Sequence, residues 1–198
     1  SLFTQFENLP FEKRAVDEFT FNQRLGREEA QKQLEQHWST WVKEEDFSRI
    51  HEYGFTHVRI PIGWWIFGDS NEYAHNISYL DQGLDWAQKY DIKVLLDLHG
   101  APGSQNGLDS SGVACRSTFE YSGYDCNTLC VVNPNWFENR TNIELTQTIL
   151  SKFVERYKDH PSVWGLAFLN EPFSLLTEAI TILKDFYEET YHLLRPMV

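Results

Sequence analysis

Three short runs of β-branched and aliphatic residues predict buried β-strands in this chain. They cover residues 56–60, 92–98 and 163–169. The last two are almost continuously apolar, as is typical of parallel strands that are covered on both faces. The pattern therefore indicates a parallel sheet at the centre of the fold.

Amphipathic helical patterns lie between and after these runs. Apolar residues recur at helical spacing over residues 47–53, 77–87, 143–157 and 176–186. Gly54 follows the first pattern and is a suitable C-terminal stop for a helix. The order is helix, strand, helix, strand, long loop, helix, strand, helix.

Two hydroxyl residues are predicted to cap helices. Ser78 precedes Asp81 by three positions, and Thr141 precedes Glu144 by the same spacing. In a capping box the hydroxyl and the acid each accept from the other residue's backbone N–H. We therefore expect helices to start at Ser78 and Thr141.

The alternation of strands and helices predicts an α/β fold made of parallel βα units. Both an open, doubly wound sheet and a (β/α)8 barrel are compatible with this order, and periodicity alone does not choose between them. The stretch from about Gly100 to Arg140 is the one long irregular insertion. Long loops in compact domains are more often functional than idle.

Composition and charge narrow the class of ligand. The chain has 198 residues, of which 41% are hydrophobic, and a formal net charge of −12. This acidic balance repels phosphate backbones and anionic membrane surfaces, so nucleic acid is not an expected partner. No apolar run approaches the ~18 residues of a membrane-spanning helix. A neutral or cationic ligand fits better.

Polar residues stand where the predicted strands end. Arg59 belongs to the end of the first strand, Asp97 and His99 to the second, and Asn170 and Glu171 to the third. Both candidate architectures bind ligands at the carboxyl ends of parallel strands. No glycine-rich phosphate-binding turn follows any strand, which weakens the open dinucleotide-binding sheet and favours the barrel.

Glu171 is the strongest candidate for catalysis, with one structural alternative. Apolar neighbours at the end of a strand would desolvate its carboxyl and favour the protonated form, as a general acid requires. Alternatively, Glu171 only caps the helix that follows, since acids are favoured near helix N-termini. Position alone gives the two interpretations similar weight.

The other polar residues and the tryptophans also have two interpretations. His99 is either a hydrogen-bond donor at a site or a histidine satisfied within the core. Arg59 either binds a carboxylate and positions Glu171 or forms a buried ion pair with Asp97 or a helix terminus. Aromatic side chains can stack on sugar rings or fill a core, and this choice concerns Trp64, Trp65 and Trp136.

Other chemistries fit the sequence less well. It contains no G-x-S-x-G elbow of a serine hydrolase and no H-E-x-x-H metal motif, so neither a metal site nor a cofactor is expected. Cys115, Cys126 and Cys130 lie in the long loop, where a local disulfide is preferred over an incomplete zinc motif. Two sequons, at Asn76 and Asn139, are weak support for secretion.

Several blocks of sequence together resemble glycoside hydrolase family 5, and within it the fungal-type exo-β-1,3-glucanases. RIPIG or NEP alone would be modest evidence, but the ordered set is specific. The matching blocks include HWSTWVKEEDF (37–47), HVRIPIGWW (57–65), DLHGAPGSQNGLDSSG (97–112) and LNEP (169–172).

The resemblance implies a (β/α)8 barrel that releases glucose from the non-reducing end of β-1,3-glucan with retention of configuration. By position, Glu171 would be the general acid/base and Asn170 would bind the substrate 2-hydroxyl. Arg59 and His99 would line the same pocket, and Asn106 matches a residue that helps to hold the terminal sugar. The resemblance also implies a monomeric enzyme that is extracellular or located in the cell wall.

The sequence departs from the family pattern at two points. Retaining hydrolysis needs a second carboxylate as the nucleophile, and the family's nucleophile follows the seventh strand, beyond residue 198. The family's first strand would precede Ser1. The chain is therefore expected to supply strands two to four, as the N-terminal half of one catalytic domain. The cysteine-bearing stretch 113–132 is also longer than the family pattern leads us to expect.

Two other functions remain open at this point. A related family 5 β-glycosidase or endoglucanase would use the same barrel on another glycan. A non-catalytic glucan-binding protein would use its aromatic residues and Arg59 without a nucleophile. The first residues, SLFTQFENLP, contain neither an initiator Met nor a basic segment followed by an apolar core, so no signal peptide is expected within these residues.

Overall fold

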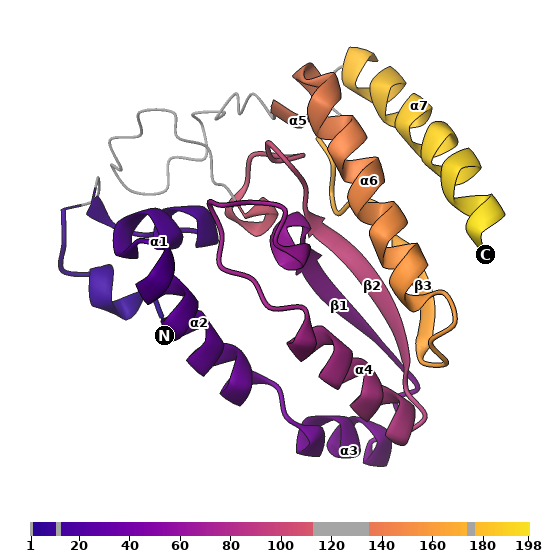
Figure 1. The fold of residues 1–198 in the computed structure, drawn as a ribbon, viewed down its shortest axis with the longest axis horizontal. Helices are drawn as coiled ribbons and strands as arrows, with labels where there is room; N and C mark the ends of the chain where they lie inside the picture. The colour runs from indigo at the N-terminus through magenta and orange to yellow at the C-terminus, as the bar shows by residue number, and fades with distance from the viewer. Residues whose placement is uncertain (1, 11–12, 113–134, 174–176) are drawn as a thin grey trace.

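The computed structural model describes residues 2–10, 13–112, 135–173 and 177–198 (Figure 1). Three strands and seven α-helices are found in this part of the chain, joined by short 3-10 turns. The strands are β1 (His57–Gly63), β2 (Lys93–Gly100) and β3 (Val163–Ala167). The helices are α1 (Glu18–Leu25), α2 (Arg27–Trp41), α3 (Glu44–Glu52), α4 (Ser78–Lys89), α5 (Asn135–Glu138), α6 (Arg140–Tyr157) and α7 (Thr177–Leu194).

The three strands form one parallel sheet in the order β1-β2-β3. Val58 is opposite Val94 in the first pair, and Leu96 is opposite Leu166 in the second. The parallel sheet and the βαβ alternation predicted from the sequence are confirmed. The third strand ends at Ala167, two residues earlier than its apolar run predicts.

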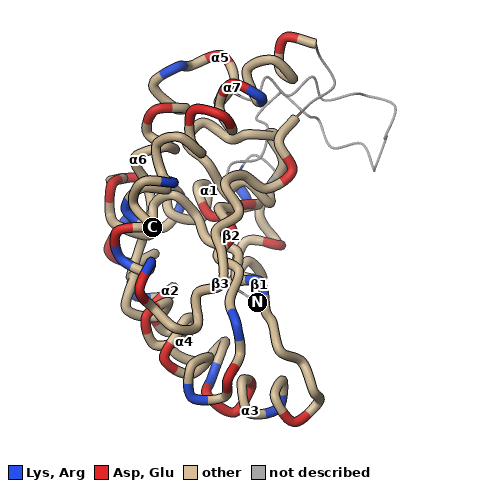
Figure 2. The backbone as a smooth tube through the Cα atoms, turned by 90° about the vertical axis from the view of Figure 1, so that its right-hand side faces the viewer, with Lys and Arg blue, Asp and Glu red and all other residues tan. Residues whose placement is uncertain are grey.

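Consecutive strands are neighbours, and the sheet does not reverse direction between them. Since crossovers between parallel strands are right-handed, helices that connect strands added in one direction lie on the same side of the sheet. Figure 2, turned by 90° from Figure 1, shows α4 and α6 together on that side. A doubly wound sheet would instead change direction and carry helices on both faces.

The alternation of side chains along β1 separates a packed face from an open one. Val58, Ile60 and Ile62 pack into the core, whereas His57 and Pro61 are exposed. Below the packed face, α4 and α6 contribute apolar residues at helical spacing. Those buried in this core include Leu80, Leu84, Ala87, Ile149, Leu150 and Phe153.

Neither of the predicted capping boxes is found. Asp81 does not turn back to its own helix, because Arg156 and the Tyr157 hydroxyl of α6 bind its carboxylate at 2.5 and 2.7 Å. Helix α6 is capped by Asn139, whose Oδ1 accepts from the backbone N–H of Thr141 at 3.0 Å. At Asp81, an ion pair with another helix takes the place of the capping box. At the start of α6, Asn139 caps the helix in place of Thr141.

The N-terminal part of the chain forms helices that apolar periodicity did not indicate. Helix α2 is polar around most of its surface and buries only Ala30 and Leu34. These two residues join Phe6 and Phe21 in a second, smaller core. A small number of buried contacts, and not a wide apolar stripe on α2, therefore stabilises the N-terminal helices.

Cys115, Cys126, Cys130 and the stretch 113–132 lie outside the described residues, so their predicted disulfide stays a prediction. Within the residues that are described, no helix has the length and apolar character needed to cross a membrane.

Candidate active site

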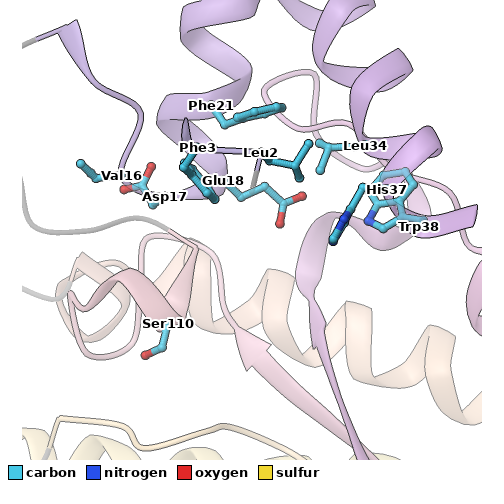
Figure 3. A pocket seen from close by; sticks show the side chains of 10 residues that line it. All are labelled: Leu2, Phe3, Val16, Asp17, Glu18, Phe21, Leu34, His37, Trp38 and Ser110. Atoms are coloured by element: carbon cyan, nitrogen blue, oxygen red, sulfur yellow. The ribbon is translucent and has the colours of Figure 1, made fainter. Parts of the chain in front are cut away.

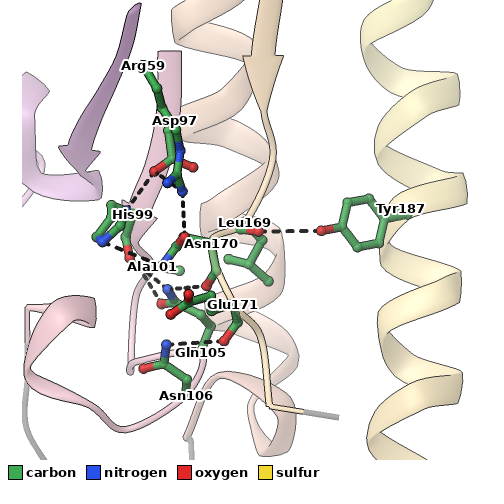
Figure 4. A network of polar contacts seen from close by, with 10 residues as sticks. All are labelled: Arg59, Asp97, His99, Ala101, Gln105, Asn106, Leu169, Asn170, Glu171 and Tyr187. Carbon is green, nitrogen blue, oxygen red and sulfur yellow. Dashed lines mark hydrogen bonds and ion pairs between the residues drawn. The ribbon is translucent and has the colours of Figure 1, made fainter. Parts of the chain in front are cut away.

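Polar side chains of β1, of β2 and of the segment after β3 meet toward the carboxyl end of the sheet (Figure 4). Arg59 lies in β1, Asp97 and His99 in β2, and Asn170 just beyond β3. Carboxyl ends of parallel strands lie on one edge of a sheet, and that topology brings together residues far apart in sequence. The four predicted neighbours Arg59, His99, Asn170 and Glu171 are thus in one place.

The Asp97 carboxylate is the centre of this network. It is fully buried, and its Oδ2 lies 2.8 Å from Arg59 Nη2 and 2.6 Å from His99 Nδ1. Among the described residues, its Oδ1 has no hydrogen-bond partner. A carboxylate only accepts hydrogen bonds, so Nδ1 of His99 carries a proton and, in the neutral ring, Nε2 is an acceptor.

Arg59 also fixes the side-chain amide of Asn170. Arg59 Nη2 donates to Asn170 Oδ1 at 2.5 Å, which turns the Asn170 Nδ2 group the other way. That Nδ2 lies 3.5 Å from His99 Nε2. Arg59 therefore takes part in the ion pair with Asp97 that one sequence interpretation gave it, and it also orients a site residue.

Glu171 lies outside the hydrogen-bond network around Asp97 and is exposed. The expectation that apolar neighbours desolvate its carboxyl is not met within the described chain. The helix-capping alternative is not met either, because Pro172 and Phe173, which follow Glu171 directly, are not helical. Its backbone φ is +42°, in the left-handed region that non-glycine residues rarely adopt.

The loop after β2 contacts both peptide carbonyls around Glu171. Gln105 Nε2 donates to Asn170 O at 2.9 Å, and Asn106 Nδ2 donates to Glu171 O at 3.1 Å. Both amide side chains are buried. Asn106, predicted as a sugar ligand, thus already holds the main chain of the candidate acid.

Two residues near this site, Gln105 and Tyr187, are not identified from the sequence. Gln105 stands in a turn without periodicity, and only its contacts in the fold distinguish it from other loop amides. Tyr187 of α7 lies with its hydroxyl 3.5 Å from Leu169 O. Burial, and then the nearby charge of Asp97, raise the pKa of Tyr187.

Two of the three tryptophans are core residues. Trp136 is fully buried and donates from Nε1 to Thr146 Oγ1 at 2.9 Å. Trp65 is buried and stacks on Tyr73 with ring centroids 4.0 Å apart. Both indoles therefore fill the core, as one of the two interpretations of the sequence holds, and do not serve as stacking surfaces for sugar.

A separate cavity of about 420 Å³ lies near the N-terminus, and Figure 3 shows the side chains around it. It is lined by Leu2, Phe3, Val16, Asp17, Glu18, Phe21, Leu34, His37, Trp38 and Ser110. None of the residues around Asp97 contributes to it. Burial raises the pKa of Glu18 to about 7; the hydrogen bond from Trp65 opposes this rise and the charge of Asp17 adds to it.

The site at the sheet end has the chemistry of an acid/base centre. It offers a solvent-accessible carboxyl, an amide donor on Asn170 and an imidazole of fixed tautomer. No cluster of three or more metal-ligating side chains is found among the residues that the structure describes. Proton transfer and binding of hydroxyl groups are the chemistry that these residues support.

Comparison with known proteins identifies the family. The family model for cellulase (glycosyl hydrolase family 5) matches residues 22–197. The chain belongs to glycosyl hydrolase family 5. The match covers the sheet, its helices and every candidate site residue, so the sequence resemblance is confirmed at the family level.

Curated family 5 relatives resemble the chain over most of its length. Glucan 1,3-beta-glucosidase 2 of Wickerhamomyces anomalus is 41% identical over 98% of this chain and 42% of its own. Glucan 1,3-beta-glucosidase of Schwanniomyces occidentalis is 40% identical over 91% of this chain and 39% of its own. The chain thus spans about two fifths of the length of these relatives.

Solved structures share the fold of this family 5 chain. Rutinosidase from Aspergillus niger superimposes with a TM-score of 0.77 at 19% identity, over 98% of this chain and 54% of its own. The structure called AoRut gives a TM-score of 0.74 at 20% identity, over 91% of this chain and 50% of its own. At these identities the likeness concerns the fold alone.

Proposed function

We propose that this chain is the acid/base part of a retaining glycoside hydrolase that releases glucose from the ends of β-1,3-glucan. Membership of family 5 and the relatives named glucan 1,3-beta-glucosidase support the reaction and the substrate. The observation that carries the proposal is the position of Glu171, an exposed carboxyl next to Asn170 at the carboxyl end of a parallel sheet.

Glu171 acts as the general acid/base in this proposal. Its carboxyl protonates the glycosidic oxygen as the bond breaks, and then deprotonates the water that releases the sugar from the enzyme. Asn170 Nδ2 binds the sugar 2-hydroxyl, because Arg59 holds Oδ1 and leaves the amide hydrogens for another acceptor. His99 and Asn106 complete the sugar pocket.

The nucleophile belongs to a part of the complete protein outside these residues. A retaining enzyme needs a second carboxylate about 5–5.5 Å from the first. Asp97 is unsuitable because it is fully buried and bound to both Arg59 and His99. We therefore assign residues 1–198 to the N-terminal half of one catalytic domain.

The complete domain is a (β/α)8 barrel in this proposal, and β1, β2 and β3 are its second to fourth strands. The sequential order of the strands and the helices on one side support a barrel over a doubly wound sheet. The open face of β1, which carries Arg59, becomes part of the barrel interior. We further propose that the enzyme is monomeric and extracellular or located in the cell wall.

The test uses the complete protein and the variant Glu171→Gln. Hydrolysis of laminarin, whose leaving group is a sugar, should fall by about 10²–10⁴-fold, since acid assistance contributes that much. Cleavage of 2,4-dinitrophenyl β-glucoside in the burst phase should change little, because this leaving group needs no proton. Equal losses on both substrates would contradict the acid role. Inverted anomeric configuration of the released glucose would contradict the retaining mechanism.

A further inference from the structure

In the part of the chain that the structure describes, no polar partner directs the Glu171 carboxyl. Among the described residues it forms no ion pair and no side-chain hydrogen bond, and it is exposed. The direction of the carboxyl therefore depends on the backbone that carries it. That backbone is strained, since φ is +42° at a residue with a Cβ, whose contact with the following carbonyl oxygen disfavours this conformation.

Four hydrogen bonds join the segment around Glu171 to β2 and to the loop after it. Asn170 N donates to Leu98 O at 3.0 Å, and Phe173 N donates to Gln105 O at 3.0 Å. The side chains of Gln105 and Asn106 donate to the carbonyls of Asn170 and Glu171. The two peptide groups that flank the Glu171 Cα are thus each held by one amide side chain.

Gln105 is itself held by its whole amide group. Its Nε2 donates to His99 O at 2.7 Å as well as to Asn170 O, and its Oε1 accepts from Ala101 N at 3.0 Å. The side chain is fully buried. Both amide hydrogens are used, so Gln105 is a rigid link between the ends of β2 and β3.

We propose that Gln105, together with Asn106, is a positioning residue that holds Glu171 in its left-handed conformation and so directs the carboxyl at the glycosidic oxygen. The inference rests on the proposed role of Glu171 and adds the groups that set its geometry. Neither amide transfers a proton. Their contribution is orientation, and a displacement of 1 Å at a reacting group can lower a rate by about 10²-fold.

The test compares two variants of the complete protein with Glu171→Gln. Gln105→Glu has nearly the same shape but loses the amide donors. Asn106→Asp keeps the oxygen that accepts from Leu108 N at 2.9 Å, and replaces the donor to Glu171 O with a charged acceptor oxygen. If Gln105→Glu does not fold, Asn106→Asp still tests the inference.

The expected result is the pattern of a misplaced acid/base. Both variants should lose laminarin hydrolysis by about 10²-fold. The burst with 2,4-dinitrophenyl β-glucoside should stay within about threefold of the parent in Gln105→Glu. For Asn106→Asp, which also changes the sugar pocket, the expected result is a larger loss on laminarin than on the aryl glucoside. Sodium azide should then raise steady-state turnover of the aryl glucoside, because azide attacks the glycosyl-enzyme without a general base. An effect on binding of sugar alone would raise KM for both substrates instead.

Ser104→Ala is the matched control in the same loop. The Ser104 hydroxyl bonds to Ser111 Oγ and to Gly107 N, and does not touch the segment around Glu171. This variant should lower stability without changing the preference between the two substrates or the response to azide.

The outcomes separate this inference from the proposed function. If Glu171→Gln gives the acid/base pattern but Gln105→Glu and Asn106→Asp do not, the positioning role is wrong and the proposed function stands. If Glu171→Gln itself lacks the pattern, both are overturned. The same pattern in Ser104→Ala would also overturn the inference, since general disturbance of the loop would then explain it.

Discussion

Trp65 Nε1 donates a hydrogen bond of 3.0 Å to Glu18 Oε1. This contact ties the first turn of α1 to the segment that follows β1. The indole also stacks on Tyr73 with an interplanar angle of 9°. A titratable carboxyl is thereby attached to a buried pair of aromatic rings.

Stability of the complete protein should fall as pH rises from about 4.5 to about 7. Burial raises the pKa of Glu18 from 4.5 to about 7, so between these values the folded state keeps a proton that the unfolded state loses. The stabilisation is fully present below 4.5 and lost above 7. Glu18→Gln cannot ionise and should flatten this part of the melting temperature profile.

Glu7→Gln is the control for this measurement. Glu7 is exposed, so its removal should leave the pH profile of the melting temperature unchanged. A Glu18→Gln profile with the same slope as the parent between pH 5 and pH 8 would show that the buried carboxyl is not the source.

Asp97→Asn should disable the site with little loss of folding. The amide keeps the shape of Asp97 but loses the charge that holds Arg59 and His99, so both side chains and Asn170 lose their orientation. We expect laminarin hydrolysis to fall by about 10–100-fold. Asp69→Asn, which removes an ion pair with Lys152 away from the sheet end, should leave kcat/KM within about twofold. Similar kinetics for the two variants would contradict the orienting role of Asp97.

Gly112→Ala should destabilise the protein more than Gly26→Ala. Both glycines have positive φ, +86° and +76°, so both substitutions carry backbone strain. A Cβ at Gly112 would lie 2.3 Å from Trp65 Cη2, whereas a Cβ at Gly26 meets nothing within 4 Å. The excess should be about 1–3 kcal/mol in urea unfolding. Equal losses would mean that the indole moves aside at no cost.

Asn139→Ala should cost about 1 kcal/mol of unfolding free energy, the usual cost of losing an N-cap. Thr141→Ala should cost less, because only the Thr141 backbone takes part in the cap. Chemical denaturation of protein made in bacteria, where this sequon stays unmodified, provides the measurement. The reverse order would restore the sequence-based choice of Thr141 as the cap.

The sequence predicts the parallel sheet well because apolar strands between amphipathic helices have few other solutions. It fails at the caps, because a spacing of three cannot reveal that Asp81 binds Arg156 of another helix. It also misplaces the environment of Glu171. The apolar run suggests a desolvated carboxyl, but burial ends at Asn170, and the Glu171 side chain that follows is exposed.

The candidate site is predicted as a set of residues but not as a network. Polar strand ends identify Arg59, His99 and Asn170, because the topology of a parallel sheet must bring them together. The role of Gln105 depends on two carbonyls, one of them 65 positions away, and no local pattern encodes such a contact. Family resemblance names residues that touch substrate, whereas supporting amides emerge only from three-dimensional contacts.

The amide contacts across the two loops have a consequence for engineering by recombination. A chimaera that takes residues 163–173 from a relative, but keeps its own residues 97–107, receives a new acid/base without the amides that evolved beside it. The main chain that carries the grafted carboxyl would then lack side-chain amides placed to bind its carbonyl groups. The two strand-and-loop segments are one transplantable unit, although more than fifty residues separate them in the sequence.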